Sequence, residues 1–172
     1  AALGRLATMN VCTVGFVCGW LGLAAAGGAQ CSLASGPYGS GCGGFTPFGI
    51  PVVTCNGAPT IGNVAFGFAT TAPCAQPANG LLLVGTCRAT PIVFTSGFGP
   101  GGWCGPSMAT CAQYLDIVAA FVGAPQPGGF TFATPVPNAP PLVGLQFCVQ
   151  GAHLCPAVPC IAVTNAVRVI LQ

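Results

Sequence analysis

The sequence predicts an all-β protein: an antiparallel β-sandwich of jelly-roll-like type, rich in disulfides, with an apolar N-terminal extension. Three observations predict this class. About eight or nine short apolar segments are separated by turn signals, a pattern typical of sandwiches and jelly rolls. No segment has a convincing helical period, and twelve cysteines are scattered along the 172 residues. We expect an apolar segment over residues 1–30 and a single β domain over residues 31–172.

The C-terminal part of the chain predicts two antiparallel strands. Over residues 142–150, Phe147 and Val149 fall on one face, and Cys148 and two glutamines fall on the other. From Ile161 to Leu171 every second residue belongs to one mainly apolar face. The four prolines of residues 135–141 exclude a central strand there, because proline has no N–H to donate. We expect a loop between the two strands that holds two cysteines, and we place His153 in it as a surface or locally hydrogen-bonded histidine.

Several motifs of this chain resemble those of a small secreted β-domain of planctomycete-type environmental bacteria, usually found as a C-terminal module. They are YGSGCGG at Tyr38–Gly44, GAPTIG at Gly57–Gly62, LLLVG at Leu81–Gly85, and PVPNAPPLVGLQ with TNAVRV near the end. Thr164 stands where that domain typically has Ser. The resemblance covers roughly Ser35–Gln172 and implies a secreted location and this fold. It implies no catalytic residue and no disulfide pattern.

The remaining strands are predicted from period-2 alternation between turn residues. The turn at Asn56–Pro59 separates the first two of them. The spacing over Ala112–Val122 also fits a helix, but its Val, Ile and Phe content favours a strand. The predicted segments are Ile50–Cys55, Ile61–Thr71, Gly80–Thr86, Ile92–Thr95, Ala112–Val122 and Gly128–Thr134, with loops at Cys31–Gly44 and Cys74–Asn79.

Residues 1–30 permit more than one interpretation. Arg5 precedes a long uncharged apolar run that ends in small residues, as in a secretory signal peptide. A membrane helix would fit by length, but the glycines and the alternation over residues 10–18 argue against it. We favour one or two retained strands around Met9–Val17, packed on this subunit or on a neighbour.

The cysteines predict an oxidising compartment, and therefore an extracellular or cell-surface protein. No C-x-x-C occurs, and one histidine cannot complete a two-Cys, two-His zinc site. We therefore expect disulfides and no metal, although spacing alone does not give their connectivity. The candidates are Cys12, Cys18, Cys31, Cys42, Cys55, Cys74, Cys87, Cys104, Cys111, Cys148, Cys155 and Cys160.

Charge is almost absent from the chain. Only 2% of its residues are charged, against about 25% in ordinary globular proteins. The surface is then either covered in an assembly or solubilised by O-linked sugars on Ser and Thr. A net charge of +2 with no clustered Lys or Arg argues against nucleic acid as a partner.

The same inventory argues against an enzyme or a cofactor protein. One Asp, no Glu, no Lys and one His leave no carboxylate pair, and no G-x-S-x-G motif supports a catalytic triad. We expect no catalytic, cofactor or metal residue. Tyr38, Trp103 and Tyr114 are the candidate ligand contacts, since aromatic faces pack on sugar rings; loop packing is the commoner role of a residue like Trp103.

Two functions remain. The first is a structural subunit of an extracellular assembly, a filament or surface layer, that self-associates without a membrane span in the assembled form. A neighbour's N-terminal strand would complete an exposed sheet edge by main-chain hydrogen bonds. The alternative is a secreted adhesion or carbohydrate-binding module with glycans as partners.

Overall fold

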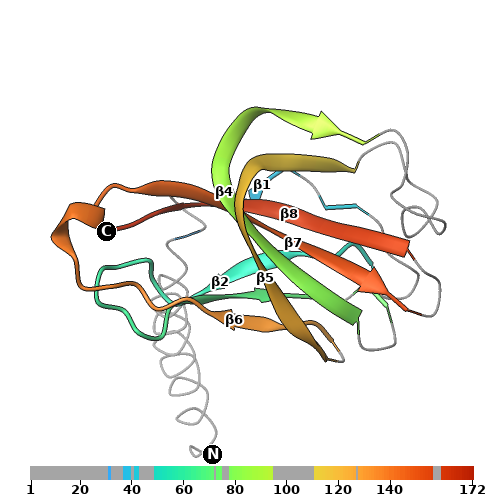
Figure 1. Ribbon diagram of the computed structural model, residues 1–172, viewed down its shortest axis with the longest axis horizontal. Coiled ribbons are helices and arrows are strands. Elements are labelled where there is room, and N and C mark those ends of the chain that lie inside the picture. Colours follow the sequence, from blue (N-terminus) through green and yellow to red (C-terminus); the bar gives the residue numbers. More distant parts are fainter. Residues whose placement is uncertain are drawn as a thin grey trace, which may run out of the picture.

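The protein is an antiparallel β-sandwich, as predicted. The computed structural model describes residues 31, 37–39, 41–42, 49–71, 73–74, 78–94, 111–126, 128–156 and 160–172. A five-stranded sheet has the order β1-β8-β7-β4-β5, and a three-stranded sheet has the order β2-β3-β6 (Figure 1). The elements are β1 (Pro37–Tyr38), β2 (Val53–Asn56), β3 (Gly67–Thr70), β4 (Ala78–Val93), β5 (Ala112–Gln126), β6 (Thr131–Ala133), the 3-10 helix η2 (Pro140–Leu142), β7 (Gln146–Cys155) and β8 (Cys160–Ile170).

The main core lies between the two sheets. Val149 of β7 and two valines of β8, Val167 and Val169, pack on the smaller sheet. There they meet Phe68 of β3 and Phe66 just before it. All five side chains are at most 5% exposed. The two phenylalanine rings meet edge to face with their centroids 5.2 Å apart, a favoured aromatic geometry. Each such side chain contributes roughly 1.5–3 kcal/mol when fully buried, so this cluster supplies the main favourable energy of the sandwich.

The β4–β5 hairpin is long and strongly curved, and it folds over the outer face of the larger sheet (Figure 1). Gln150 of β7 fixes the folded-over end of β5. Its side-chain N–H groups donate to the carbonyl oxygens of Ala112 (2.9 Å) and Thr164 (3.0 Å), and its Oε1 accepts from the N–H of Tyr114 (3.2 Å). The amide of a fully buried glutamine therefore replaces a main-chain partner that the curved strand would otherwise lack.

A second buried amide connects the two sheets. Oδ1 of Asn165 in β8 accepts from the N–H of Val53 at 2.9 Å, and its Nδ2 donates to the carbonyl of the same residue at 3.3 Å. Val53 begins β2 of the smaller sheet. The amide therefore pairs with β2 as a short piece of backbone would, and it fixes how the sheets lie on each other.

Replacing Gln150 with Met is expected to lower the free energy of unfolding by about 2 kcal/mol, because buried main-chain groups of Ala112 and Tyr114 lose their partner. Urea unfolding followed by circular dichroism measures this. The matched control is Gln146→Met, the same change at the exposed start of β7, expected within about 0.5 kcal/mol of the parent. Equal losses in the two variants would contradict the role of Gln150.

Several predicted strand boundaries are wrong for local reasons. Residues 61–66 form turns rather than strand, because Nδ2 of Asn63 donates to the carbonyl of Ala58 and its Oδ1 accepts from Ala65. The two short segments predicted at 80–86 and 92–95 are one strand, β4, which accommodates Pro91 in an irregular stretch between Cys87 and Ile92. The segment predicted at 50–55 is β2, that at 128–134 shortens to β6, and the loop predicted at 31–44 contains β1.

The predicted single apolar face of the last strand is also wrong. In β8 the residues Thr164 and Asn165 lie opposite Gly151 alone, a β-bulge that reverses the alternation. Val167 and Val169 therefore enter the core between the sheets, whereas Ile161 and Val163 pack on the outer face with Cys42 and Phe94. The expected N-terminal strand at 9–17 and the domain boundary at residue 30 lie outside the described residues.

His153 is neither a surface residue nor part of a loop, contrary to the prediction. β7 continues to Cys155, so His153 lies inside a strand and is 1% exposed. Its ring stacks on Phe130, with the centroids 4.7 Å apart and the planes at 26°. Phe130 in turn occupies the space above Gly80, where an added Cβ would lie 1.5 Å from its ring. Neither ring nitrogen of His153 has a hydrogen-bond partner among the described residues, and burial lowers the pKa of His153 from 6.5 to about 4.

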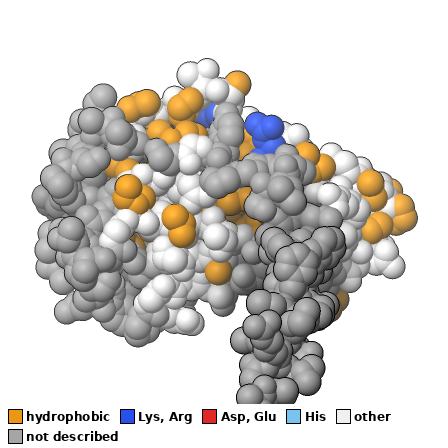
Figure 2. All heavy atoms as spheres, turned by 180° about the vertical axis from the view of Figure 1, so that it is seen from behind, with side chains coloured by type: hydrophobic (Ala, Val, Ile, Leu, Met, Phe, Trp, Pro, Cys, Tyr) orange, Lys and Arg blue, Asp and Glu red, His pale blue; other side chains and the backbone are white. Residues whose placement is uncertain are grey.

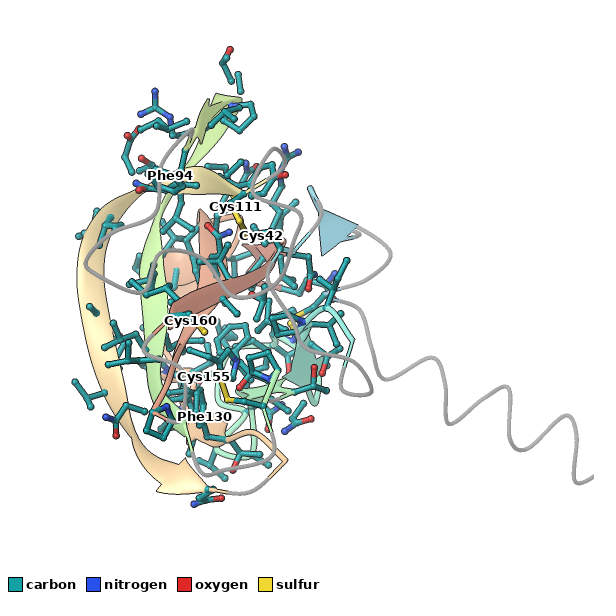
Figure 3. The ribbon with its side chains drawn as sticks, turned by 90° about the vertical axis from the view of Figure 1, so that its right-hand side faces the viewer. Cys42, Phe94, Cys111, Phe130, Cys155 and Cys160 are labelled. Carbon is teal, nitrogen blue, oxygen red and sulfur yellow. A yellow bond between two sulfur atoms is a disulfide. The ribbon has the colours of Figure 1, made fainter. Side chains whose placement is uncertain are left out.

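Disulfides connect the parts of the sandwich, as predicted. Cys87–Cys148 links β4 to β7, and Cys74–Cys155 links the segment after β3 to the end of β7. Cys42–Cys111 connects a residue paired with β8 to the start of β5 (Figure 3), and Cys31–Cys55 connects residue 31 to β2. Cys160 is disulfide-bonded too, whereas Cys12, Cys18 and Cys104 lie outside the described residues. These bonds indicate an oxidising environment, extracellular or periplasmic.

Candidate interaction surface

The outer edge of β5 is the most distinctive surface of the described structure. β5 is the last strand of the larger sheet, and it pairs with β4 on one side only. Among the described residues no strand pairs with its other side. Figure 3 shows β5 as the outermost arc of the sheet. Such an edge presents a row of main-chain N–H and C=O groups to which another strand can bind.

The side chains of this edge are apolar on both faces. Val118 and Val122 are 77% and 79% exposed, and Ile117 and Phe121 are each 48% exposed. Val118 is exposed because a register shift opposite Val84 and Gly85 leaves it without a partner on β4. Proteins usually protect a long edge with lysine, proline or inward charge. The chain has no lysine, and β5 carries one charged residue, Asp116. Its protective features are Pro125 near its end and the bulge at Val118, and neither lies within the regular stretch 119–123.

The single charge on β5 is already paired. Arg88 of β4 donates to the carboxylate of Asp116, and the two side chains are 31% and 59% exposed. An exposed ion pair of this kind contributes about 0–1 kcal/mol, so its role in stability is small. Its effect on the surface is larger, because it neutralises the one acid beside the apolar residues of the edge.

An apolar cleft adjoins the edge. It has a volume of about 280 Å³ and lies where the sheets separate. Its lining includes Phe121 of β5, Phe147 of β7, Leu145 just before β7, and Pro135 and Pro137 after β6. Phe121 and Leu145 are both about half exposed at its mouth. The cleft makes the apolar surface of the β5 edge continuous with the opening of the sandwich.

The opposite edge of the larger sheet, at β8, also has few pairing partners among the described residues. β1 covers β8 at two residues, where Pro37 and Tyr38 pair with Val167 and Ala166, and a single bridge follows between Cys42 and Val163. Much of the edge of β8 is therefore without a described strand beside it. Seen from behind, the described surface shows scattered hydrophobic side chains, and arginine is the one charged type visible there (Figure 2).

Of the three predicted ligand contacts, the structure places Tyr114 next to the end of β1, the strand that contains Tyr38. The ring of Tyr114 in β5 packs against Gly39, which follows Tyr38 of β1; an added Cβ at Gly39 would lie 2.0 Å from that ring. The ring face on that side is therefore covered. Trp103 lies outside the described residues. No group of three or more His, Cys, Asp or Glu in the described part of the chain could hold a metal ion.

The sequence contains a signal for the β5 edge that alternation alone does not reveal. Ile117–Val118 and Phe121–Val122 are adjacent apolar pairs, and a strand turns one member of each pair to either face. Apolar pairs of this kind indicate either a strand buried on both faces or an exposed apolar edge. The strand order, in which β5 is the last strand, shows that the pairs belong to an exposed apolar edge.

The fold and this surface define a class of protein: a disulfide-stabilised β-sandwich with an apolar sheet edge that carries a single charged residue. Comparison of the chain with models of known protein families, with curated proteins and with solved structures finds no match in any of the three. The resemblance to the secreted β-domain therefore stays a prediction. No helix in the described ranges combines the length and hydropathy that crossing a bilayer requires.

Proposed function

We propose that the protein is a structural subunit of an extracellular assembly, a filament or surface layer, and that it self-associates through the edges of its larger sheet. The observation that supports this most is the β5 edge. A strand of 15 residues exposes four large apolar side chains and carries one charge, which is paired. An edge of this composition favours association over solvation.

The strand order supports growth beyond a dimer. β5 and β8, the latter with its two-residue partner β1, lie at opposite sides of the larger sheet. If a subunit binds neighbours at both edges, the assembly can grow in two directions, as a filament or layer requires. The predicted strand from residues 1–30 of a neighbour would complete the β8 side, where the described partners are the two-residue β1 and the bridge at Cys42.

The disulfides and the near absence of charge fit the same function. A shared surface that is covered by neighbours needs few charges to remain soluble, and covalent cross-links within each subunit preserve the fold outside the cell. The alternative, a carbohydrate-binding module, depends on aromatic faces that are accessible, and the Tyr114 ring is packed against Gly39.

Replacing Val122 with Lys is expected to raise at least tenfold the concentration at which the protein associates, because each contact then buries a charge without a partner. Sedimentation velocity over a range of concentrations, with electron microscopy of the native sample, measures this. The matched control is Val64→Lys: Val64 is 80% exposed, like Val122 at 79%, but lies in the turn before β3. A parent protein that remains monomeric at every concentration would contradict the proposed function.

A further inference from the structure

We propose that the partner of the β5 edge is the β5 edge of a second copy, paired antiparallel about a two-fold axis at Phe121. This inference rests on the proposed function and specifies its first contact. The two larger sheets would join into one continuous sheet, with β5 of each copy at the centre. A two-fold contact of this kind uses the same surface on both subunits, so one apolar edge is sufficient.

The position of the axis follows from the regular part of β5. Residues 119–123 pair with β4 without interruption, whereas the register shifts next to Val118 and again beyond Gly123. A new strand pairs best with a regular stretch. Centring the contact on Phe121 uses the whole of residues 119–123 and keeps both irregular positions at its ends.

The side chains at this register complement one another. Phe121 of one copy lies beside Phe121 of the other, and Val122 lies beside the small Ala120. Directly opposed residues in an antiparallel pair have their Cβ atoms about 4.5–5.5 Å apart, close enough for the two half-exposed rings to pack. An aromatic pair contributes about 0.5–1.5 kcal/mol beyond its buried area.

Charge does not oppose this contact. In the same register Asp116 of one copy lies opposite Gln126 of the other, so the two aspartates are separated by ten positions, or about 33 Å along the strand. That distance exceeds the Debye length of about 8 Å at physiological ionic strength. Each aspartate also has Arg88 of its own subunit as a partner.

The size of the contact predicts its strength. In this register residues 116–126 of the two copies pair, a stretch about 36 Å long and about 10 Å deep, the thickness of a packed sheet, which covers roughly 360 Å² on each copy. The total of roughly 700 Å² is below the 1,000 Å² or so of stable specific interfaces, as in weak, transient contacts. We therefore expect a reversible dimer, which the second edge of each sheet extends into a larger assembly.

Photo-crosslinking of the full-length protein tests the proposal. Benzoylphenylalanine at position 122 is expected to give covalent dimers on irradiation, and mass spectrometry of the digested dimer should locate the bond in residues 119–123 of the second copy. The same group at the equally exposed position 64 is the control and should give few dimers. Circular dichroism of both variants checks that they are folded.

The outcomes separate this inference from the function on which it rests. If the parent protein assembles but the bond from position 122 lies in residues 1–30 or elsewhere outside β5, the β5 pairing is wrong and the assembly remains. If the parent protein is monomeric in sedimentation, both are wrong. Phe121→Ala gives an independent measurement: it should raise the dissociation constant of the dimer about tenfold, and an unchanged constant would overturn the register.

Discussion

Reduction of the disulfides is expected to unfold this protein at 25 °C. The bonds Cys31–Cys55, Cys42–Cys111, Cys74–Cys155 and Cys87–Cys148 span 24, 69, 81 and 61 residues. In the chain-entropy model each loop of this length contributes about 3.5–4.5 kcal/mol. Their joint effect is comparable to the 5–15 kcal/mol of stability of a typical domain. Near-UV circular dichroism before and after reduction and alkylation measures the loss of tertiary structure.

Single bonds allow a sharper comparison. Cys87–Cys148 joins two strands that already pair within one sheet, whereas Cys74–Cys155 joins the connection between β3 and β4 to the end of β7. If the bonds act mainly on the unfolded chain, replacing either pair by alanine should cost about 4 kcal/mol. A reduced and alkylated chain that keeps its near-UV signal and a cooperative transition would show that packing alone maintains the sandwich.

Acid is expected to destabilise the protein through a single residue, His153. Because burial lowers its pKa to about 4 in the folded state, below the 6.5 of an unfolded chain, the neutral form is favoured on folding. The stabilisation is complete above pH 6.5, decreases as the pH falls from 6.5 to 4, and has been lost near pH 4, where the folded state also binds the proton. The expected decrease is about 3 kcal/mol.

The measurement is the free energy of unfolding in urea at pH 7.5 and pH 4.5, with the disulfides intact. The composition makes the test clean, because the chain has one side-chain carboxylate and one histidine. The charged groups Arg88, Asp116 and Arg168 lie several register positions away from Gly80 and Ala162, which flank His153 in the sheet. A His153→Leu variant should lose most of the pH dependence; an equal dependence in that variant would contradict the assignment.

The sequence predicted the fold class because alternation, turn residues and cysteine spacing all report local physics. It located β5, β7 and β8 for the same reason. It did not predict which strand lies at the edge of the larger sheet, since strand order is a property of the whole sheet. The adjacent apolar residues Val118 and Phe121–Val122 of β5 acquire their meaning only from that order.

The sequence also misassigned residues whose role depends on partners far along the chain. His153 looked like a loop residue because two prolines and two cysteines follow it, yet β7 continues past it and Phe130 covers its ring. Gln150 looked like a residue of a polar face, although the end of β5 folds over that face and bonds to it. The bulge in β8 has no signal in the local alternation at all, because it arises from pairing with Gly151.

The positions of the basic residues in the strands affect how readily a protease can cleave this protein. A trypsin-like protease cleaves after Lys or Arg, and the described part of the chain offers it Arg88 and Arg168. Both belong to strands of the larger sheet, β4 and β8. Cleavage requires the peptide to leave its ladder and enter the enzyme as an extended segment. Within the described residues, the scarcity of basic side chains thus also limits tryptic cutting to two bonds that the sheet holds in place.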